Sequence, residues 1–365
     1  MVIVSRARGI VKTAVAYALS STRADSLIAR LAEFDARAVV VGYHRVVDDF
    51  TDEATRAIPP LLTSRRMLEQ QLDWIGQRFR FVTLDEMGRR LSGEIPLTQP
   101  VAAVTFDDGY RDVFEEGFPI LARKGIPAGV FVVTDLVGTE EALVHDRLYL
   151  LLTRAFRRWP DAPRSLRALL VGLGIRPSGI DRPWEVAGHP MAALQFVLRS
   201  LRRSDVGRIL AALEERLGPG TPTPGMLPLT WEMLAQMKRA GMVVGSHTKT
   251  HVWLPREELG DAFEELRRSR EAIESRLSAP VQHFAYPDGR FDRVIPEVVA
   301  AAGYRFGYTT CAHRHPDHSL LTLPRLMLWE DACIDARGRF SSAVMSCQMR
   351  GVFDLVRGCD QDHAA

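Results

Sequence analysis

The dipeptide Asp107-Asp108 is the first feature of this sequence that could do chemistry. Alone it also fits a hairpin turn, because Asp-Gly between apolar runs is a common turn signal. Here, however, it stands between the apolar run 101–106 and residues 111–124, which predict a helix, so the turn joins a strand to a helix. Adjacent carboxylates repel each other unless a cation or a proton relieves the repulsion. The motif therefore favours a reactive site over a simple turn.

The second feature is a pair of histidines, His247 and His251, directly after the apolar run 242–245. Histidines at positions i and i+4 of one helical turn face the same way and can ligate one metal. The pair also fits two surface or capping histidines. One carboxylate and two imidazoles would leave coordination positions open for water, as in a catalytic metal site. Asp108 with this pair therefore predicts a hydrolytic metal centre.

The elements around these motifs must bring them to one place. Three times a predicted helix ends at a glycine that is followed by a short apolar run, the pattern of strands buried on both faces. Residues 38–135 and 229–330 alternate in this way, which indicates an α/β fold with a parallel sheet, open or closed into a barrel. Because the carboxyl ends of parallel strands share one rim, we expect Asp108 and the histidines to meet there.

The rest of the chain is organised around this barrel, which is expected over residues 38–330. Residues 138–226 interrupt the alternation and predict a mostly helical insertion, with a separate domain as the alternative. The insertion ends in the linker-like run 218–225, which is rich in Gly, Pro and Thr. Residues 1–37 predict an N-terminal amphipathic helical segment, and residues 331–365 a C-terminal tail.

The first residues resemble a signal peptide only faintly. Basic residues precede a short apolar stretch at 13–19, and Arg23 and Asp25 follow soon after it. The pattern fits better a basic amphipathic helix of the kind that rests on a membrane surface. No run of about 18 apolar residues is present, so we expect no ordinary transmembrane helix. We expect a cytoplasmic protein and leave open a peripheral membrane contact through this helix.

Composition narrows the classes of partner. The formal net charge of +2 gives no whole-chain reason to expect nucleic acid. The 46% hydrophobic and 25% charged residues are ordinary for a globular protein. The four cysteines contain no CxxC pair, so neither a zinc knuckle nor a disulfide framework is expected. These cysteines, which we expect to be reduced, are Cys311, Cys333, Cys347 and Cys359.

Together with the histidine pair, residues 105–110 (TFDDGY) resemble the first two motifs of the polysaccharide deacetylase family, also called the nodulation-deacetylase homology domain and similar to carbohydrate esterase family 4. The resemblance extends through residues 43–46, 284–292 and 323–326, each at a predicted strand end. The early position of 43–46 resembles the subgroup with a permuted motif order. The resemblance implies a distorted (β/α) barrel with fewer than eight complete strands, and it does not cover the insertion or the tail.

The resemblance also implies a role for each motif residue. Asp108, His247 and His251 would hold a divalent metal, usually zinc (Zn2+) in this family. Such a metal lowers the pKa of a bound water to about 7 and polarises an amide carbonyl. Asp107 would be the general base, beside the metal but not bound to it. His44 would be the general acid that protonates the leaving amine, and its alternative is a core histidine bonded to the backbone.

Two departures from the family pattern leave details open. Ala285 stands where the family has an arginine that orients the base. Arg325 is the best substitute, because a guanidinium can pair a carboxylate bidentately, and Arg111 is the runner-up. Asp288 stands where the family has a tyrosine whose backbone N–H forms the oxyanion hole, a role that does not depend on the side chain. The side chains expected to contact the substrate are Tyr110, Tyr286 and Asp288.

Two other polar groups are weaker candidates. His145-Asp146 in the insertion lies near the expected rim and could touch the substrate, but a solvated loop fits it better. The cluster of His313, His315 and His318 resembles a metal site by composition only, because it falls in an apparent loop.

We therefore expect metal-dependent hydrolysis of an N-acetyl amide on an amino sugar, with an N-acetylated polysaccharide, oligosaccharide or lipid-linked glycan as partner and acetate as product. One alternative keeps the chemistry but acts on a small N-acyl compound or an N-formyl sugar. Another is a carbohydrate-binding barrel without turnover, which the complete set of reactive residues disfavours. A nuclease or phosphatase would need a second metal and more carboxylates. The sequence leaves the exact glycan, the metal and the oligomeric state open.

Overall fold

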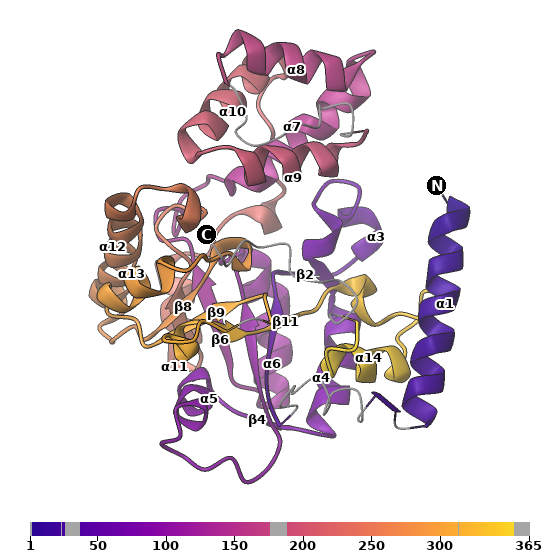
Figure 1. Ribbon diagram of the computed structural model, residues 1–365, viewed down its shortest axis with the longest axis vertical. Helices are drawn as coiled ribbons and strands as arrows, with labels where there is room; N and C mark the ends of the chain where they lie inside the picture. Colours follow the sequence, from indigo (N-terminus) through magenta and orange to yellow (C-terminus); the bar gives the residue numbers. More distant parts are fainter. Residues whose placement is uncertain (1, 23, 26–36, 176–187, 313, 354–365) are drawn as a thin grey trace.

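A sheet of parallel strands forms the centre of the computed structural model, which describes residues 2–22, 24–25, 37–175, 188–312 and 314–353 (Figure 1). Its strands run in the order β10-β9-β8-β7-β6-β5-β1-β11, with β4 beside β5. In chain order they are β1 (Ala38–Tyr43), β4 (Arg80–Phe81), β5 (Val101–Phe106), β6 (Ala128–Val132), β7 (Val243–Ser246), β8 (His283–Ala285), β9 (Phe306–Thr309), β10 (Leu323–Pro324) and β11 (Leu326–Met327). A separate parallel pair joins β2 (Arg45–Val47) and β3 (Leu62–Ser64).

One short segment, residues 323–327, brings the two edges of this sheet together. Its first half, β10, pairs with β9, and its second half, β11, pairs with β1. Only Arg325 separates the two halves. The strands therefore form a nearly closed parallel barrel with helices around it, as the sequence predicted.

The barrel strands are apolar because both of their faces are covered. Every residue of β5 and of β6 is buried, as expected for parallel strands between a packed interior and an outer layer of helices. Small residues allow the close packing at the centre. At Gly245 in β7, an added Cβ would lie 2.6 Å from the ring of Phe131 and 2.9 Å from the carbonyl oxygen of His283. No larger residue fits that position without displacing a strand.

The helices are α1 (Val2–Ser21), α3 (Phe50–Glu53), α4 (Arg65–Gly76), α5 (Leu84–Leu91), α6 (Phe118–Lys124), α7 (Val144–Arg158), α8 (Ala162–Gly172), α9 (Pro190–Ser200), α10 (Arg203–Leu217), α11 (Trp231–Arg239), α12 (Leu259–Leu277), α13 (Ile295–Ala301) and α14 (Ser342–Met349). Ser64 caps α4 as predicted, because its hydroxyl accepts the N–H of Met67. The helix predicted over 111–124 is present, and it contains one π-helical turn, Val113–Gly117, which leads into α6.

The insertion places four helices, α7 to α10, at one end of the molecule, at the top of Figure 1. They have an apolar core of their own, which is separate from that of the barrel. That core is built mainly from leucines, such as Leu151, Leu169 and Leu213, all of which are buried. Residues 176–187 of the insertion lie outside the described part.

The N-terminal helix α1 lies beside α14 at the side of the barrel (Figure 1). Ala16 is buried against Val344 and Cys347, so residues 342–353, expected as part of a tail, instead form a docking site for α1. The continuation of this helix expected through residues 27–31 lies outside the described residues. Cys333 and Cys347 are buried free thiols, and Cys359 also lies outside the described part.

The opposite face of α1 is apolar and exposed. Ile10, Val11, Val15 and Tyr17 are 45–71% exposed. Lys12 is the only charged residue from position 9 to 22, and its ammonium donates a hydrogen bond inward to the carbonyl of Ala332. Across the described helices, none is long and apolar enough to cross a membrane.

Candidate metal centre

Asp108, His247 and His251 converge at the carboxyl-end rim of the barrel, as the sequence predicted. Their ligand atoms all lie within 4.8 Å of one another. Asp108 Oδ1 is 3.1 Å from His251 Nε2 and 3.4 Å from His247 Nε2, yet this buried oxygen makes no well-aligned hydrogen bond. An orphaned carboxylate oxygen between two imidazole nitrogens fits a shared cation better than a protein–protein contact. The donor set is therefore suited to a divalent metal with open coordination positions.

The histidine pair is held by a loop, so the prediction of one helical turn is wrong. Thr248 and His251 have φ values of 66° and 61°, in the left-handed region. The hydroxyl of Thr248 accepts the backbone N–H of His251 at 2.9 Å. Thr250 donates its N–H and its hydroxyl to Glu265 of α12 at 2.9 and 2.7 Å. These bonds, rather than helical spacing, turn His251 back toward His247.

The orientation of His247 follows from its other ring nitrogen. His247 Nδ1 lies 2.8 Å from the carbonyl oxygen of Ala285. Because a carbonyl can only accept, Nδ1 carries the hydrogen and Nε2 turns its lone pair toward Asp108. Ala285, which lacks the arginine side chain of the family pattern, thus contributes its backbone instead.

Asp107 does not belong to this ligand group and pairs with Arg325. Both oxygens of Asp107 lie 2.7 Å from the two terminal nitrogens of the guanidinium, one oxygen on each. One of these nitrogens also lies 3.2 Å from the hydroxyl of Thr105, and the guanidinium stands over the ring of Phe131 at 5.3 Å. Arg325, and not Arg111, therefore occupies the position expected for the arginine that orients the base.

Each of the two aspartates has a lowered pKa, and different neighbouring groups lower it in the two cases. Burial alone would raise the pKa of Asp107, but the charges of Arg325 and then His247 lower it below its ordinary value. Burial would likewise raise the pKa of Asp108, and the neighbouring His251 and His247 hold it well below the usual range. Both carboxylates are therefore ionised at neutral pH, one facing a cationic side chain and one facing two imidazoles.

His44 lies at the same rim, between β1 and β2. Burial lowers its pKa from the ordinary value, and the charges of Asp108 and Asp107 oppose that effect. Its imidazole is thus within electrostatic reach of both carboxylates. The charges of His247 and Arg325 also reach it, so His44 belongs to the same group of buried ionisable side chains.

The expectation that His145 and Asp146 form a solvated loop is wrong, because both side chains are buried at the start of α7. The hydroxyl of Tyr110 lies 2.7 Å from Asp146 Oδ2 and 2.8 Å from His145 Nε2. Since a carboxylate can only accept, Tyr110 donates to Asp146 and accepts from His145. The ring of His145 meets that of His251 with centroids 5.0 Å apart. The insertion thus supplies one wall of the metal centre, a position near the rim that the sequence analysis gave as the weaker alternative for His145-Asp146.

Three side chains were expected to contact the substrate, but the hydroxyl groups of two of them, Tyr110 and Tyr286, bond to other parts of the protein. The hydroxyl of Tyr110 is used by the insertion, as described, and its ring is fully buried. Tyr286 is also fully buried, and its hydroxyl donates to the carbonyl of Leu321 at 2.9 Å. Asp288 differs, because its side chain is half exposed in a turn with φ 54°. Burial lowers the pKa of His251, but Asp108 and, to a smaller extent, the charge of Asp288 raise it, so Asp288 lies close to the metal ligands.

The histidine cluster near residue 315 is structural. His315 is buried, and one ring nitrogen lies 3.0 Å from the carbonyl of Arg293. The other accepts the backbone N–H groups of Asp317 and His318. His313 lies outside the described residues. Within the part of the chain that is described, Asp108, His247 and His251 are the only such ligand group.

The metal centre opens into a small cavity of about 50 Å³ between the insertion and the barrel. His145 and apolar side chains such as Leu198 and Val206 line it from the insertion, and His251 and Trp253 line it from the barrel. A substrate that reaches the centre by this route therefore touches both units.

Comparisons with known proteins agree with the family resemblance of the sequence motifs. A family model described as polysaccharide deacetylase matches residues 94–157 and 189–307, together half of the chain. YxkH of Bacillus subtilis (strain 168), which is provisionally named a polysaccharide deacetylase, is 22% identical over 89 residues. That match covers 24% of this chain and 32% of YxkH, so the chain spans about a third of this relative's length.

Two solved structures share the fold along most of their length. One is the Streptococcus pyogenes deacetylase PplD in complex with acetate, with a TM-score of 0.51 and 18% identity over 82% of this chain and 95% of that one. The other is IcaB from Ammonifex degensii, with a TM-score of 0.53 and 21% identity over 86% and 96% of the two chains. At these identities the likeness concerns the barrel fold.

Replacing Arg325 with methionine should reveal the buried ion pair through the pH dependence of stability. In the native protein the low pKa of Asp107 contributes stability above the ordinary carboxyl pKa, and this contribution is lost as the pH falls through the lowered value. In Arg325→Met the buried carboxylate has no partner, which costs about 3–5 kcal/mol at pH 8. The deficit should shrink at pH 5, because burial raises the pKa of Asp107 toward that range. Urea unfolding at both pH values measures it.

Two further variants control this measurement. Arg111→Met removes a partly buried arginine that does not pair with Asp107, and its deficit should not depend on pH in this way. Adding Asp107→Asn to Arg325→Met should restore part of the lost stability. A deficit of equal size at pH 5 and pH 8 would show that lost packing, rather than the unpaired charge, explains the effect.

Proposed function

Because this chain belongs to the polysaccharide deacetylase family, a family of carbohydrate deacetylases, we propose that it hydrolyses the N-acetyl amide of an amino sugar and releases acetate. The substrate would be a polysaccharide, an oligosaccharide or a lipid-linked glycan. One observation supports this most: two adjacent aspartates have separate partners, with Asp107 held by Arg325 and Asp108 held among two histidines. Amide hydrolysis needs that separation between a proton acceptor and a metal ligand.

In this proposal Asp107 accepts the proton of the attacking water. Each of its oxygens accepts one hydrogen bond from Arg325 and retains a second lone pair. The water oxygen bonds to the acetyl carbon while its proton passes to Asp107. The carbon–nitrogen bond then breaks, and His44 donates the proton that allows the sugar nitrogen to leave as an amine. Arg325 positions Asp107 and keeps it ionised.

The residues present fit a divalent metal at Asp108, His247 and His251. We propose zinc, because two imidazoles and one carboxylate with an open position form a typical catalytic zinc site. When bound, the metal would polarise the amide carbonyl and favour ionisation of water. The carbonyl of Ala285 orients the imidazole of His247, and the hydroxyl of Thr248 fixes the backbone of His251.

Two alternatives remain distinguishable by experiment. A small N-acyl compound or an N-formyl sugar would use the same residues, and a release assay for formate against acetate separates these substrates. A carbohydrate-binding barrel without turnover would not require Asp107 to be held ionised in a buried site. A metal-loaded sample that releases no acetate from any N-acetyl glycan tested would favour the binding protein.

Substitutions of Asp107 and His251 should distinguish the role of the general base from that of a metal ligand. We expect Asp107→Asn to lower kcat by about 10²–10⁴-fold while the protein retains its metal, because the base is lost but the ligands stay. We expect His251→Ala to lose both activity and metal. Acetate release and metal content of the purified variants measure the two effects. Appreciable activity in Asp107→Asn would refute the assignment of the base.

His44 should be visible in the pH–rate profile. A reaction that needs protonated His44 slows as the pH rises through the pKa of this imidazole, which burial lowers from its ordinary value. Native enzyme should therefore show a basic limb in kcat/KM, and His44→Ala should lack that limb and be slower throughout. If the limb persists in His44→Ala, another group donates the proton.

We also propose that α1 rests on a membrane surface. Its outward face from Ile10 to Tyr17 is apolar and carries no charge, because Lys12 points toward Ala332. A helix of this kind can bury its apolar face at the headgroup boundary. This contact would suit a lipid-linked glycan.

Sedimentation with phosphatidylcholine–phosphatidylglycerol vesicles tests the contact. Val11→Asp should reduce the bound fraction severalfold, since it puts a charge on the exposed apolar face that would enter the membrane surface. Val171→Asp is the matched control, because Val171 is an exposed valine on α8 of the insertion. Equal binding by both variants and the native protein would contradict the proposal.

A further inference from the structure

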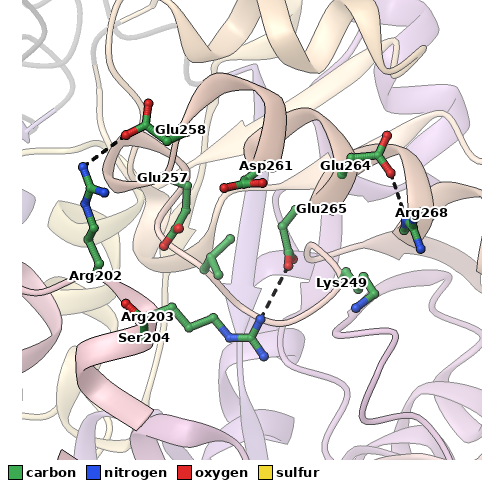
Figure 2. A pocket seen from close by; sticks show the side chains of 11 residues that line it. Arg202, Arg203, Ser204, Lys249, Glu257, Glu258, Asp261, Glu264, Glu265 and Arg268 are labelled. Atoms are coloured by element: carbon green, nitrogen blue, oxygen red, sulfur yellow. Dashed lines mark hydrogen bonds and ion pairs between the residues drawn. The ribbon is translucent and has the colours of Figure 1, made fainter. Parts of the chain in front are cut away.

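A groove of about 720 Å³ separates the insertion from the helix α12 of the barrel (Figure 2). Arg202, Arg203 and Ser204 line it at the start of α10, and residues of α12 line the facing wall. None of its lining residues is aromatic, so the groove does not offer a surface on which a neutral sugar ring could stack. Whatever it binds is recognised by charge and hydrogen bonds.

The groove continues the cavity at the metal centre. Arg203, Val252 and Glu257 line both of them. Glu265, another lining residue, also accepts the two hydrogen bonds from Thr250 that shape the loop of His251. An extended ligand could therefore lie in the groove with its neighbouring unit at the metal ligands.

The basic side chains of the groove are already neutralised. Their partners lie close, as the dashed lines in Figure 2 show for three pairs. The four pairs are Arg202–Glu258 (3.2 Å), Arg203–Glu265 (3.8 Å), Arg268–Glu264 (2.8 Å) and Lys249–Asp135 (2.6 Å). An anionic ligand such as a phosphate or a uronate would have to break these pairs. The groove is thus poorly suited to anions.

Two carboxylates are left over. Glu257 and Asp261 line the groove, and within the described part of the chain neither forms an ion pair. The carboxylate of Glu257 lies near the carboxylate of Glu265, and also near the backbone N–H of Arg203 and the guanidinium groups of Arg203 and Arg202. The groove lining carries five carboxylates and four basic side chains, so its surplus charge is negative, and a cationic ligand would relieve it.

We propose that this groove is a subsite for an amino-sugar unit whose nitrogen is already free, bound as an ammonium by Glu257 and Asp261. The inference rests on the proposed deacetylation. That reaction turns a neutral amide into an amine, and the amine takes a proton from water to become a cation. The product of one turnover thus carries the charge that the groove accepts, while an acetylated neighbour occupies the metal centre. The enzyme then favours chains that are already partly deacetylated.

Binding of a cationic oligomer tests the subsite directly. The probes are fully deacetylated glucosamine hexamers of (1→4) and (1→6) linkage, titrated calorimetrically into the metal-loaded protein at low salt. The double variant Glu257→Gln/Asp261→Asn should bind the better of the two about three- to thirtyfold more weakly, as expected for two exposed ion pairs. Raising the salt to about 0.5 M should weaken binding to the native protein and leave the variant nearly unchanged.

A matched variant controls for net charge. Glu215→Gln/Glu271→Gln removes one carboxylate from α10 and one from α12, both outside the groove lining, and should bind like the native protein. Equal weakening in both double variants would overturn the subsite, because net charge alone would then explain binding. Binding too weak to measure in the native protein would overturn it as well.

Kinetics separate a failure of this inference from a failure of the proposed function. The ratio of kcat/KM for a partly deacetylated hexamer to that for monomeric N-acetylglucosamine should fall in Glu257→Gln/Asp261→Asn and stay unchanged in the control. If the enzyme releases acetate but this kcat/KM ratio is unchanged in Glu257→Gln/Asp261→Asn, the subsite is refuted and the proposed deacetylase activity still holds. No acetate release, together with hexamer binding that depends on the two carboxylates, would refute the deacetylase and leave a cation-binding groove.

Discussion

The bidentate contact between Asp107 and Arg325 is the interaction on which the rest of the site depends. Arg325 stands between β10 and β11, which pair with opposite edges of the sheet, so the residue at the closure of the barrel also pairs with the carboxylate. Two charges buried this deeply are stable only together, because either one alone would lose its hydration without compensation. Closure of the barrel and ionisation of Asp107 are therefore coupled.

The same constraint explains how adjacent aspartates come to have different environments. Asp107 directly follows β5 and reaches the guanidinium at the barrel closure, whereas Asp108 has φ 70° and turns toward the histidine loop. A left-handed backbone at a residue other than glycine costs energy, and such residues concentrate at functional sites. Here the turn at Asp108 separates the two carboxylates, so that Asp107 pairs with Arg325 and Asp108 joins the two histidines at the candidate metal site.

The insertion contributes side chains to this site. His145 and Asp146 bind the hydroxyl of Tyr110, which follows the aspartates in sequence, and thus join α7 to the barrel rim. The same unit supplies one wall of the charged groove. The family model also matches residues 94–157 and 189–307, so much of the insertion lies within the part of the chain that the family shares.

The sequence by itself determined the longer apolar strands of the barrel, the cap at Ser64 and the ligand group of Asp108 with the two histidines, because strong apolar runs and strand-end motifs report local structure and a shared rim. It could not determine that Arg325 rather than Arg111 reaches Asp107, since that depends on the closure of strands more than 200 residues apart. Nor could it show that Tyr110 serves the insertion, or that the His251 loop is left-handed. Those outcomes follow from packing and from hydrogen bonds between distant segments, which only the tertiary structure brings together.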